Sequence, residues 1–168
     1  MQDVFSRYLW TEALMDKRPE TVAKAFEDIL ERAGTSPRSV TSDQGPEFDG
    51  PFKDMLDSKG IERSQKRPAD KNAIATIDVA IGNLKKALVR DTRRLGSNDW
   101  ASRLQKVTKG QNNIPNDEYL DKNTPTDART NKKLIEKLQV KNAEFTAIKR
   151  KRIKNEPWIS NGQANFAQ

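Results

Sequence analysis

The 168-residue chain contains no cysteine and no histidine. Their absence excludes thiol nucleophiles, imidazole bases and zinc sites built from the usual ligands. Any metal bound by this chain must therefore be a hard cation held by carboxylate oxygens. The sequence also lacks an apolar run long enough to cross a bilayer, and its first ten residues lack the basic stretch and apolar segment of an export signal. We therefore expect a protein that is not secreted and has no membrane partner.

Apolar residues are scarce, at 34% of the chain, while charged residues reach 33%. The length allows one domain with a core of ordinary size plus an appendage. The net charge of +7 is uneven, because residues 129–154 hold ten basic and two acidic residues and the remainder is close to neutral. We therefore predict a core over residues 1–126 and a basic extension over residues 127–168, helical or disordered, that binds polyanions.

The order of patterns along the chain predicts an α/β fold. Residues 3–14 are typical of a β-hairpin with a Ser6-Arg7 turn. The other expected elements are strands ending at Asp43 and covering 61–64, and helices over 19–34, 51–59, 73–94, 98–109 and 126–154. In the long helix an apolar stripe predicts the buried face, formed by Ile74, Ile77, Ile81, Leu84 and Leu88.

Two aspartates, Asp43 and Asp78, are candidate ligands of a divalent metal ion. Asp43 closes a predicted strand just before Gly45-Pro46 breaks it, and Asp78 lies 35 positions later in the long helix. Carboxylates from separate elements that face one cleft are suited to a divalent metal ion for phosphoryl transfer. Each acid also has a simpler interpretation. Asp43 is typical of a turn residue that caps its own backbone, and Asp78 of the solvated face of an amphipathic helix.

The segment TSDQGPEF, residues 41–48, resembles the Ser/Thr-Asp-x-Gly-x-x-Phe signature of retroviral and retrotransposon integrases. These are DDE polynucleotidyl transferases with an RNase H-like fold. Asp78, followed by Leu84 and Lys85 six and seven positions later, resembles the helix that carries the family's third acid. The family has Glu where this chain has Asp. DVFSR, at residues 3–7, resembles the second strand of the same core.

The resemblance implies a central mixed sheet flanked by helices, with Mg²⁺ or Mn²⁺ held by Asp43 and Asp78 as catalytic acids. It implies that Lys85 contacts DNA. The implied reaction is DNA 3′-end processing followed by strand transfer, performed by a homo-oligomer in the nucleus, or in a virion or cytoplasmic particle. The family's first catalytic Asp lies one strand before the hairpin and so falls outside this sequence. We therefore expect Asp3 to be structural and catalysis to suffer. An alternative alignment places Thr76 at the third acid's position.

The segment KRKRIK follows at residues 149–154, and its Lys149, Arg150, Lys151 and Arg152 are expected to bind DNA or to serve as a nuclear address. Three functions remain open at this point. The first is the integrase core of a transposable element or virus, and the second is a non-catalytic nucleic-acid-binding protein derived from such a core. The third is an RNase H-type nuclease, which would cleave RNA–DNA hybrids.

Overall fold

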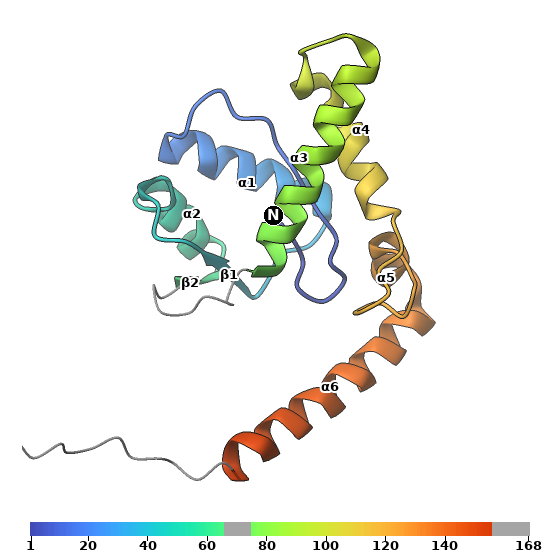
Figure 1. Cartoon of the computed structure of the whole chain (residues 1–168). Coiled ribbons are helices and arrows are strands. Elements are labelled where there is room, and N and C mark those ends of the chain that lie inside the picture. The colour runs from blue at the N-terminus through green and yellow to red at the C-terminus, as the bar shows by residue number, and fades with distance from the viewer. Residues whose placement is uncertain (66–74, 156–168) are drawn as a thin grey trace, which may run out of the picture.

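The computed structural model describes residues 1–65 and 75–155 (Figure 1). Its elements in chain order are α1 (Pro19–Ala33), β1 (Ser39–Ser42), η1 (Pro46–Phe48), α2 (Pro51–Ser58), β2 (Glu62–Gln65), α3 (Ala75–Leu95), α4 (Trp100–Asn112), α5 (Pro125–Thr130) and α6 (Lys132–Asn155). The four predicted helices between residues 19 and 109 are confirmed to within a few residues. The predicted helix over 126–154 is divided into α5 and α6, because Asn131 leaves the helical region with φ −87° and ψ 104°.

The sheet of the described residues consists of β1 and β2, which pair in parallel with Ser39 opposite Glu62 and Ser42 opposite Gln65. Parallel neighbours require a crossover, and α2 supplies it. The expected hairpin is reduced to one antiparallel bridge between Gln2 and Leu9, outside this sheet. The prediction of a central mixed sheet is therefore corrected: the described residues form two parallel strands beside a largely helical body.

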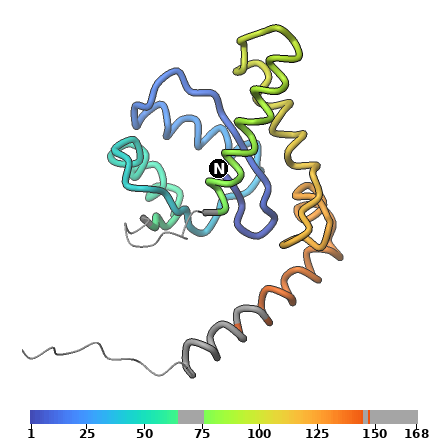
Figure 2. Tube along the Cα trace, viewed as in Figure 1, coloured from blue at the N-terminus to red at the C-terminus, as the bar shows by residue number. Residues whose placement is uncertain are grey.

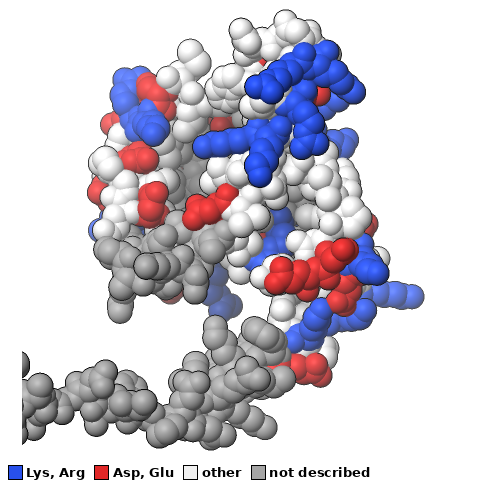
Figure 3. All heavy atoms as spheres, viewed as in Figure 1, with Lys and Arg blue, Asp and Glu red and all other residues white. Residues whose placement is uncertain are grey.

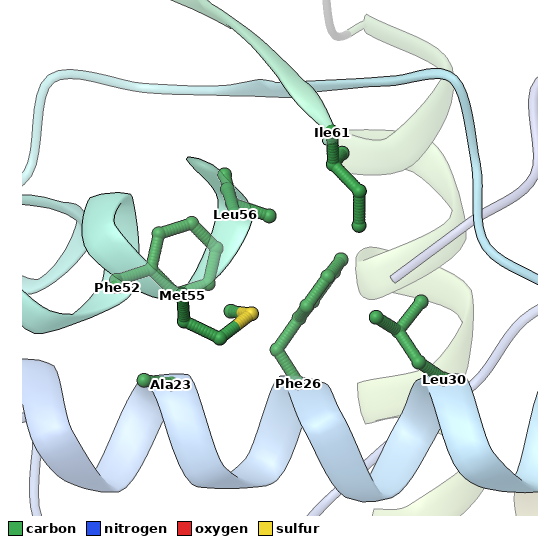
Figure 4. Close-up of a cluster of buried hydrophobic side chains, with 7 residues drawn as sticks. All are labelled: Ala23, Phe26, Leu30, Phe52, Met55, Leu56 and Ile61. Carbon is green, nitrogen blue, oxygen red and sulfur yellow. The ribbon is translucent and has the colours of Figure 1, made fainter. Parts of the chain in front are cut away.

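A hydrophobic core lies between α1, α2 and the start of β2 (Figure 4). Phe26 of α1 packs edge-on against Phe52 of α2, with ring centroids 5.4 Å apart. Leu56 and Ile61 close the cluster and are 0% and 2% exposed. α1 ends at Gly34, whose φ of 67° belongs to the left-handed region that glycine adopts without strain. These contacts fix the sheet, and with it the loop that follows β1.

The N-terminal segment is attached to α4 by side-chain hydrogen bonds rather than by strand pairing. The Asn112 side chain accepts from the Leu9 N–H at 2.8 Å and donates to the Leu9 carbonyl at 2.9 Å. Gln105 donates to the Thr11 carbonyl at 2.8 Å, and the Thr11 and Thr108 hydroxyls lie 2.8 Å apart. Because these α4 side chains occupy backbone groups that a neighbouring strand would use, the segment does not extend the sheet.

α3 and α4 form an antiparallel helical hairpin, seen side by side in Figures 1 and 2. The Arg103 guanidinium bonds to the Asp91 carboxylate at 2.7 Å across the two helices, with both side chains mostly buried. Leu84 is buried as predicted, whereas Ile81 is 41% exposed and not part of the core. Ile74 lies outside the described residues. The Asp91–Arg103 pair marks the side of α3 that meets α4, and Ile81, about 80° around the helix from Asp91, is left toward solvent.

A second cluster joins the end of the chain to its beginning. Phe5 packs against four buried residues, Leu120, Ala128, Leu134 and Leu138. The guanidinium of Arg129 stacks on Tyr8 and Trp10, at 4.9 and 4.8 Å from their ring centroids, and donates to the Ala33 carbonyl at the end of α1. The division at residue 126 stays a prediction, and packed residues continue to Leu138. Among the helices within residues 1–65 and 75–155, none has the length and apolar content that a bilayer span requires.

Candidate metal and DNA-binding site

Asp43 stands directly after β1, as predicted, and its side chain is exposed. Its Oδ1 accepts a hydrogen bond from the Gly45 N–H at 3.2 Å, which forms the turn that ends the strand. The simpler interpretation of Asp43 as a turn residue is thus confirmed. Its Oδ2 has no hydrogen-bond partner among the described residues, so this oxygen remains available for a ligand.

Arg63 of β2 forms hydrogen bonds to both ends of the loop that carries Asp43, which runs from Ser42 to Asp49. Its Nε donates to the Ser42 hydroxyl at 3.3 Å and its Nη1 to the Asp49 carboxylate at 2.9 Å. The Ser42 hydroxyl in turn donates to the Asp43 carbonyl at 3.0 Å. The Arg63 side chain is only 8% exposed, and its Nη2 has no partner within the described part of the chain. The Arg63 guanidinium thus joins β2 to both ends of the loop, although the Asp49 carboxylate is itself exposed.

Sequence reasoning gave no role to Glu47, whose carboxylate folds back over Gly45. A Cβ at position 45 would meet that carboxylate, and the flexible Glu47 side chain would have to move aside. The loop therefore holds two acids, Asp43 and Glu47, on either side of Gly45. The signal for Glu47 was present in the sequence, as an acid four positions after Asp43.

Asp78 lies in the first turn of α3 and is exposed, as is Lys85. At 100° per residue, the seven positions between them bring the two side chains to within about 20° of each other around the helix. Neither has a hydrogen bond or ion pair with a described residue. Thr76, the alternative at this position, is partly buried. No hydrogen bond or ion pair joins Asp43 to Asp78 or either acid to Lys85.

The donor set suits one weakly held hard cation. Mg²⁺ in proteins commonly takes one or two carboxylates and keeps several waters, which Asp43 and Asp78 would satisfy. A two-metal centre needs a bridging carboxylate in addition. Within residues 1–65 and 75–155, no group of three or more acidic, histidine or cysteine side chains is placed to hold a metal ion.

Several basic side chains of the tail contact other residues of the chain, so fewer of them are available to bind DNA than the composition predicted. Arg129 stacks on Tyr8 and Trp10. Lys137 and Lys141 of α6 bind the Asp121 carboxylate at 3.2 and 2.5 Å, which lowers the pKa of Asp121 through hydrogen bonds from Lys141 and then Lys137. Residues 149–152 continue α6, and their side chains lie outside the described part of the structure. Their role in DNA binding stays a prediction.

No protein-family model matches the chain. Its fold nevertheless matches solved structures of retroviral integrases. A chain of the simian T-cell lymphotropic virus intasome aligns with a TM-score of 0.69 and 15% identity over 77% of this chain and 46% of that one. The BIV integrase catalytic core aligns with a TM-score of 0.63 and 14% identity, over 86% of both chains. The fold is that of a retroviral integrase catalytic core.

A third integrase core, from HTLV-2 and solved in complex with magnesium, aligns with a TM-score of 0.62 and 17% identity over 74% of this chain and 78% of that one. In sequence, the chain is 29% identical over 115 residues to a transposon-derived protein of Caenorhabditis elegans. It spans 40% of the length of that relative, and the match covers 68% of this chain. The integrase-core fold and the transposon-derived relative agree with the resemblance seen in TSDQGPEF.

Proposed function

We propose that this chain is the catalytic core of a DNA-integrating enzyme, with Asp43 and Asp78 as ligands of Mg²⁺ or Mn²⁺. One observation carries the proposal: in an integrase-core fold, Asp43 follows β1 directly, in a loop that Arg63 fastens at both ends. The reaction would be 3′-end processing and strand transfer on DNA, by a homo-oligomer of the chain.

Each side chain has a distinct task in this proposal. Asp43 and Asp78 would hold the cation, which when bound polarises the phosphodiester and stabilises developing negative charge. Lys85, on the same side of α3 as Asp78, would bind a phosphate oxygen next to the reacting one. Arg63 touches no substrate and acts as a positioning residue, because it fixes the Ser42–Asp43 backbone through the Ser42 hydroxyl.

The direct test is the nicking and joining of plasmid DNA by the full chain in Mg²⁺ or Mn²⁺. We expect a low rate, because two carboxylates hold metal weakly. Asp43→Asn and Asp78→Asn should each remove at least 90% of it. Asp57→Asn is the matched control, since Asp57 is an exposed acid of α2 whose carboxylate has no partner among the described residues. Equal activity of all four proteins would overturn the assignment of the two acids.

A second candidate function is non-catalytic DNA binding on the same fold. It is favoured by the absence, among the described residues, of any three-acid group placed for a metal. Salt-sensitive DNA binding that needs no metal and is unchanged in Asp43→Asn would support this candidate. Loss of binding together with activity in Asp43→Asn would instead favour a single catalytic DNA site.

A further inference from the structure

Two parts of the molecule carry opposite net charges, acidic in one and basic in the other, although together they are nearly neutral. Residues 1–65 hold thirteen acidic and nine basic residues, whereas residues 75–112, which form α3 and α4, hold three acidic and eight basic residues. Figure 3 shows the consequence as a gathering of Lys and Arg over the α3–α4 hairpin, toward its connected end. Because the two parts nearly cancel, the charge of the core as a whole is close to zero, and composition predicted polyanion binding for the tail instead.

The basic residues of the two parts also differ in how they are paired. In residues 1–65, five of the nine form ion pairs with carboxylates, and these are Arg18, Lys24, Arg32, Lys59 and Arg63. In α3 and α4 the corresponding ion pair among the described residues is that of Arg103 with Asp91. Seven cations of this hairpin therefore have no carboxylate partner in the described part of the chain and are available to an external anion.

Four of these cations lie along one side of α3. Lys86, Arg90, Arg93 and Arg94, which we call the α3 basic stripe, are all exposed. They fall within an arc of about 100° around the helix and extend about 12 Å along it. The centre of this arc lies about 110° around the helix from Asp91, which pairs with Arg103 of α4, and Arg94 is the member of the stripe nearest to Asp91. The same centre lies about 120° from the side that carries Asp78 and Lys85, so the stripe is distinct from the candidate metal site.

Asp91 of α3 lies close to basic residues of both α3 and α4. Hydrogen bonding from Arg103 lowers the pKa of Asp91, and the positive charges of Lys106 and Arg94 lower it further. Arg94 and Lys106 therefore both lie near Asp91, and this acid is already bound to Arg103. The ion pair fixes the two helices relative to each other, so the cations are presented on a preformed scaffold.

We propose that the α3 basic stripe binds the phosphate backbone of double-stranded DNA. Duplex DNA carries one charge per about 1.7 Å of axis, so the length of the stripe corresponds to about seven phosphate charges. The whole of α3 contains no aromatic side chain, and stacking on such side chains is what typically holds single strands. It offers long, unpaired guanidinium and ammonium groups, which grip phosphates without reading sequence. The inference rests on the proposed function in taking DNA as the partner, and it adds a contact remote from the reacting phosphate.

The test compares three full-length proteins by the fluorescence anisotropy of a labelled duplex of arbitrary sequence and, separately, of one of its single strands. They are the wild type, R90Q/R93Q/R94Q, and the matched control K17Q/R38Q/K53Q, which removes the same charge from exposed, unpaired side chains within residues 1–65. Titrations run from about 50 to about 200 mM salt, where phosphate contacts change affinity most. Circular dichroism verifies that the substituted helices remain folded.

We expect the stripe variant to bind duplex about tenfold more weakly near 100 mM salt, with the slope of log affinity against log salt reduced by about 2.7. The control variant should stay within about twofold of the wild type. Equal losses in both variants would mean that only net charge matters and would overturn the stripe. A greater loss for single-stranded than for duplex DNA would overturn the choice of duplex. If the wild type fails to bind DNA at all, the proposed function fails; if it binds and the stripe variant binds equally, only this inference fails.

Discussion

The side chain of Asn112 pairs with both backbone groups of Leu9, 103 positions away, accepting at 2.8 Å and donating at 2.9 Å. A neighbouring β-strand would make the same two bonds. Asn112 is 2% exposed, so its amide has no access to water as an alternative partner. This one side chain therefore joins the N-terminal segment to the end of α4.

Replacing Asn112 by Ala should lower the free energy of unfolding by about 2–3 kcal/mol, because two backbone groups of Leu9 lose their partner. Urea unfolding followed by circular dichroism measures the change. Asn113→Ala is the control, since the exposed Asn113 side chain makes one hydrogen bond, to the Lys109 carbonyl. We expect the control to cost less than about 1 kcal/mol. Equal losses in the two variants would show that Asn112 has no special role.

Arg63→Met should destabilise the chain by about 1–3 kcal/mol, because it removes the bonds to Ser42 and Asp49 while keeping much of the apolar volume. It should also shift the backbone amide resonances of residues 43–49, which report the loop directly. Arg38→Met provides a matched control, since the exposed Arg38 side chain makes no bond to a described residue. Unchanged loop resonances in the Arg63 variant would contradict its positioning role.

The Asp91–Arg103 pair predicts a dependence of stability on pH. The hydrogen bond from Arg103 lowers the pKa of folded Asp91 below its ordinary value of about 4. The unfolded chain therefore binds more protons in the acid range, and the stabilisation is complete above about pH 4 and lost as the pH falls through the folded value. Melting temperatures from pH 6 to pH 2.5 should fall less steeply for Asp91→Asn than for the wild type. Asp57→Asn, measured in parallel, should follow the wild-type curve.

The packing of α5 and α6 predicts the outcome of truncation. A chain ending at residue 144 keeps Arg129, Leu134 and Leu138 and should match the full chain in stability. A chain ending at residue 126 loses them and should be less stable by at least about 3 kcal/mol, since two leucines lose their burial. Urea unfolding compares the two. Equal stability would support the predicted domain division at residue 126.

Most of the helices could be predicted because the residues that begin and end them are adjacent in the sequence. Pro19 opens α1 and Gly34 ends it, and apolar spacing marks the face between. The strand before Asp43 and the turn after it were likewise encoded within a few residues. The resemblance to integrases was recognisable in TSDQGPEF because the loop that carries it is short and local.

The misplaced features depend on residues far apart in sequence. Arg129 counted as tail charge, yet it stacks on Tyr8 and Trp10, and no periodicity signals such a contact. The Asn112–Leu9 pairing, which replaces an expected strand contact, is similarly invisible in a single sequence. Ile81 fits the apolar stripe of α3 but is exposed, because the position of α4 decides which part of the stripe is covered.

The central claim is that Asp43 and Asp78 share one divalent cation. Paramagnetic Mn²⁺ tests it directly, because it broadens the amide resonances of nearby residues in a ¹⁵N-labelled chain. We predict that small additions broaden residues 43–48 and 76–80 together, and that Asp43→Asn abolishes both effects while Asp57→Asn abolishes neither. Broadening of only one of the two segments, or broadening that persists in Asp43→Asn, would contradict the shared site.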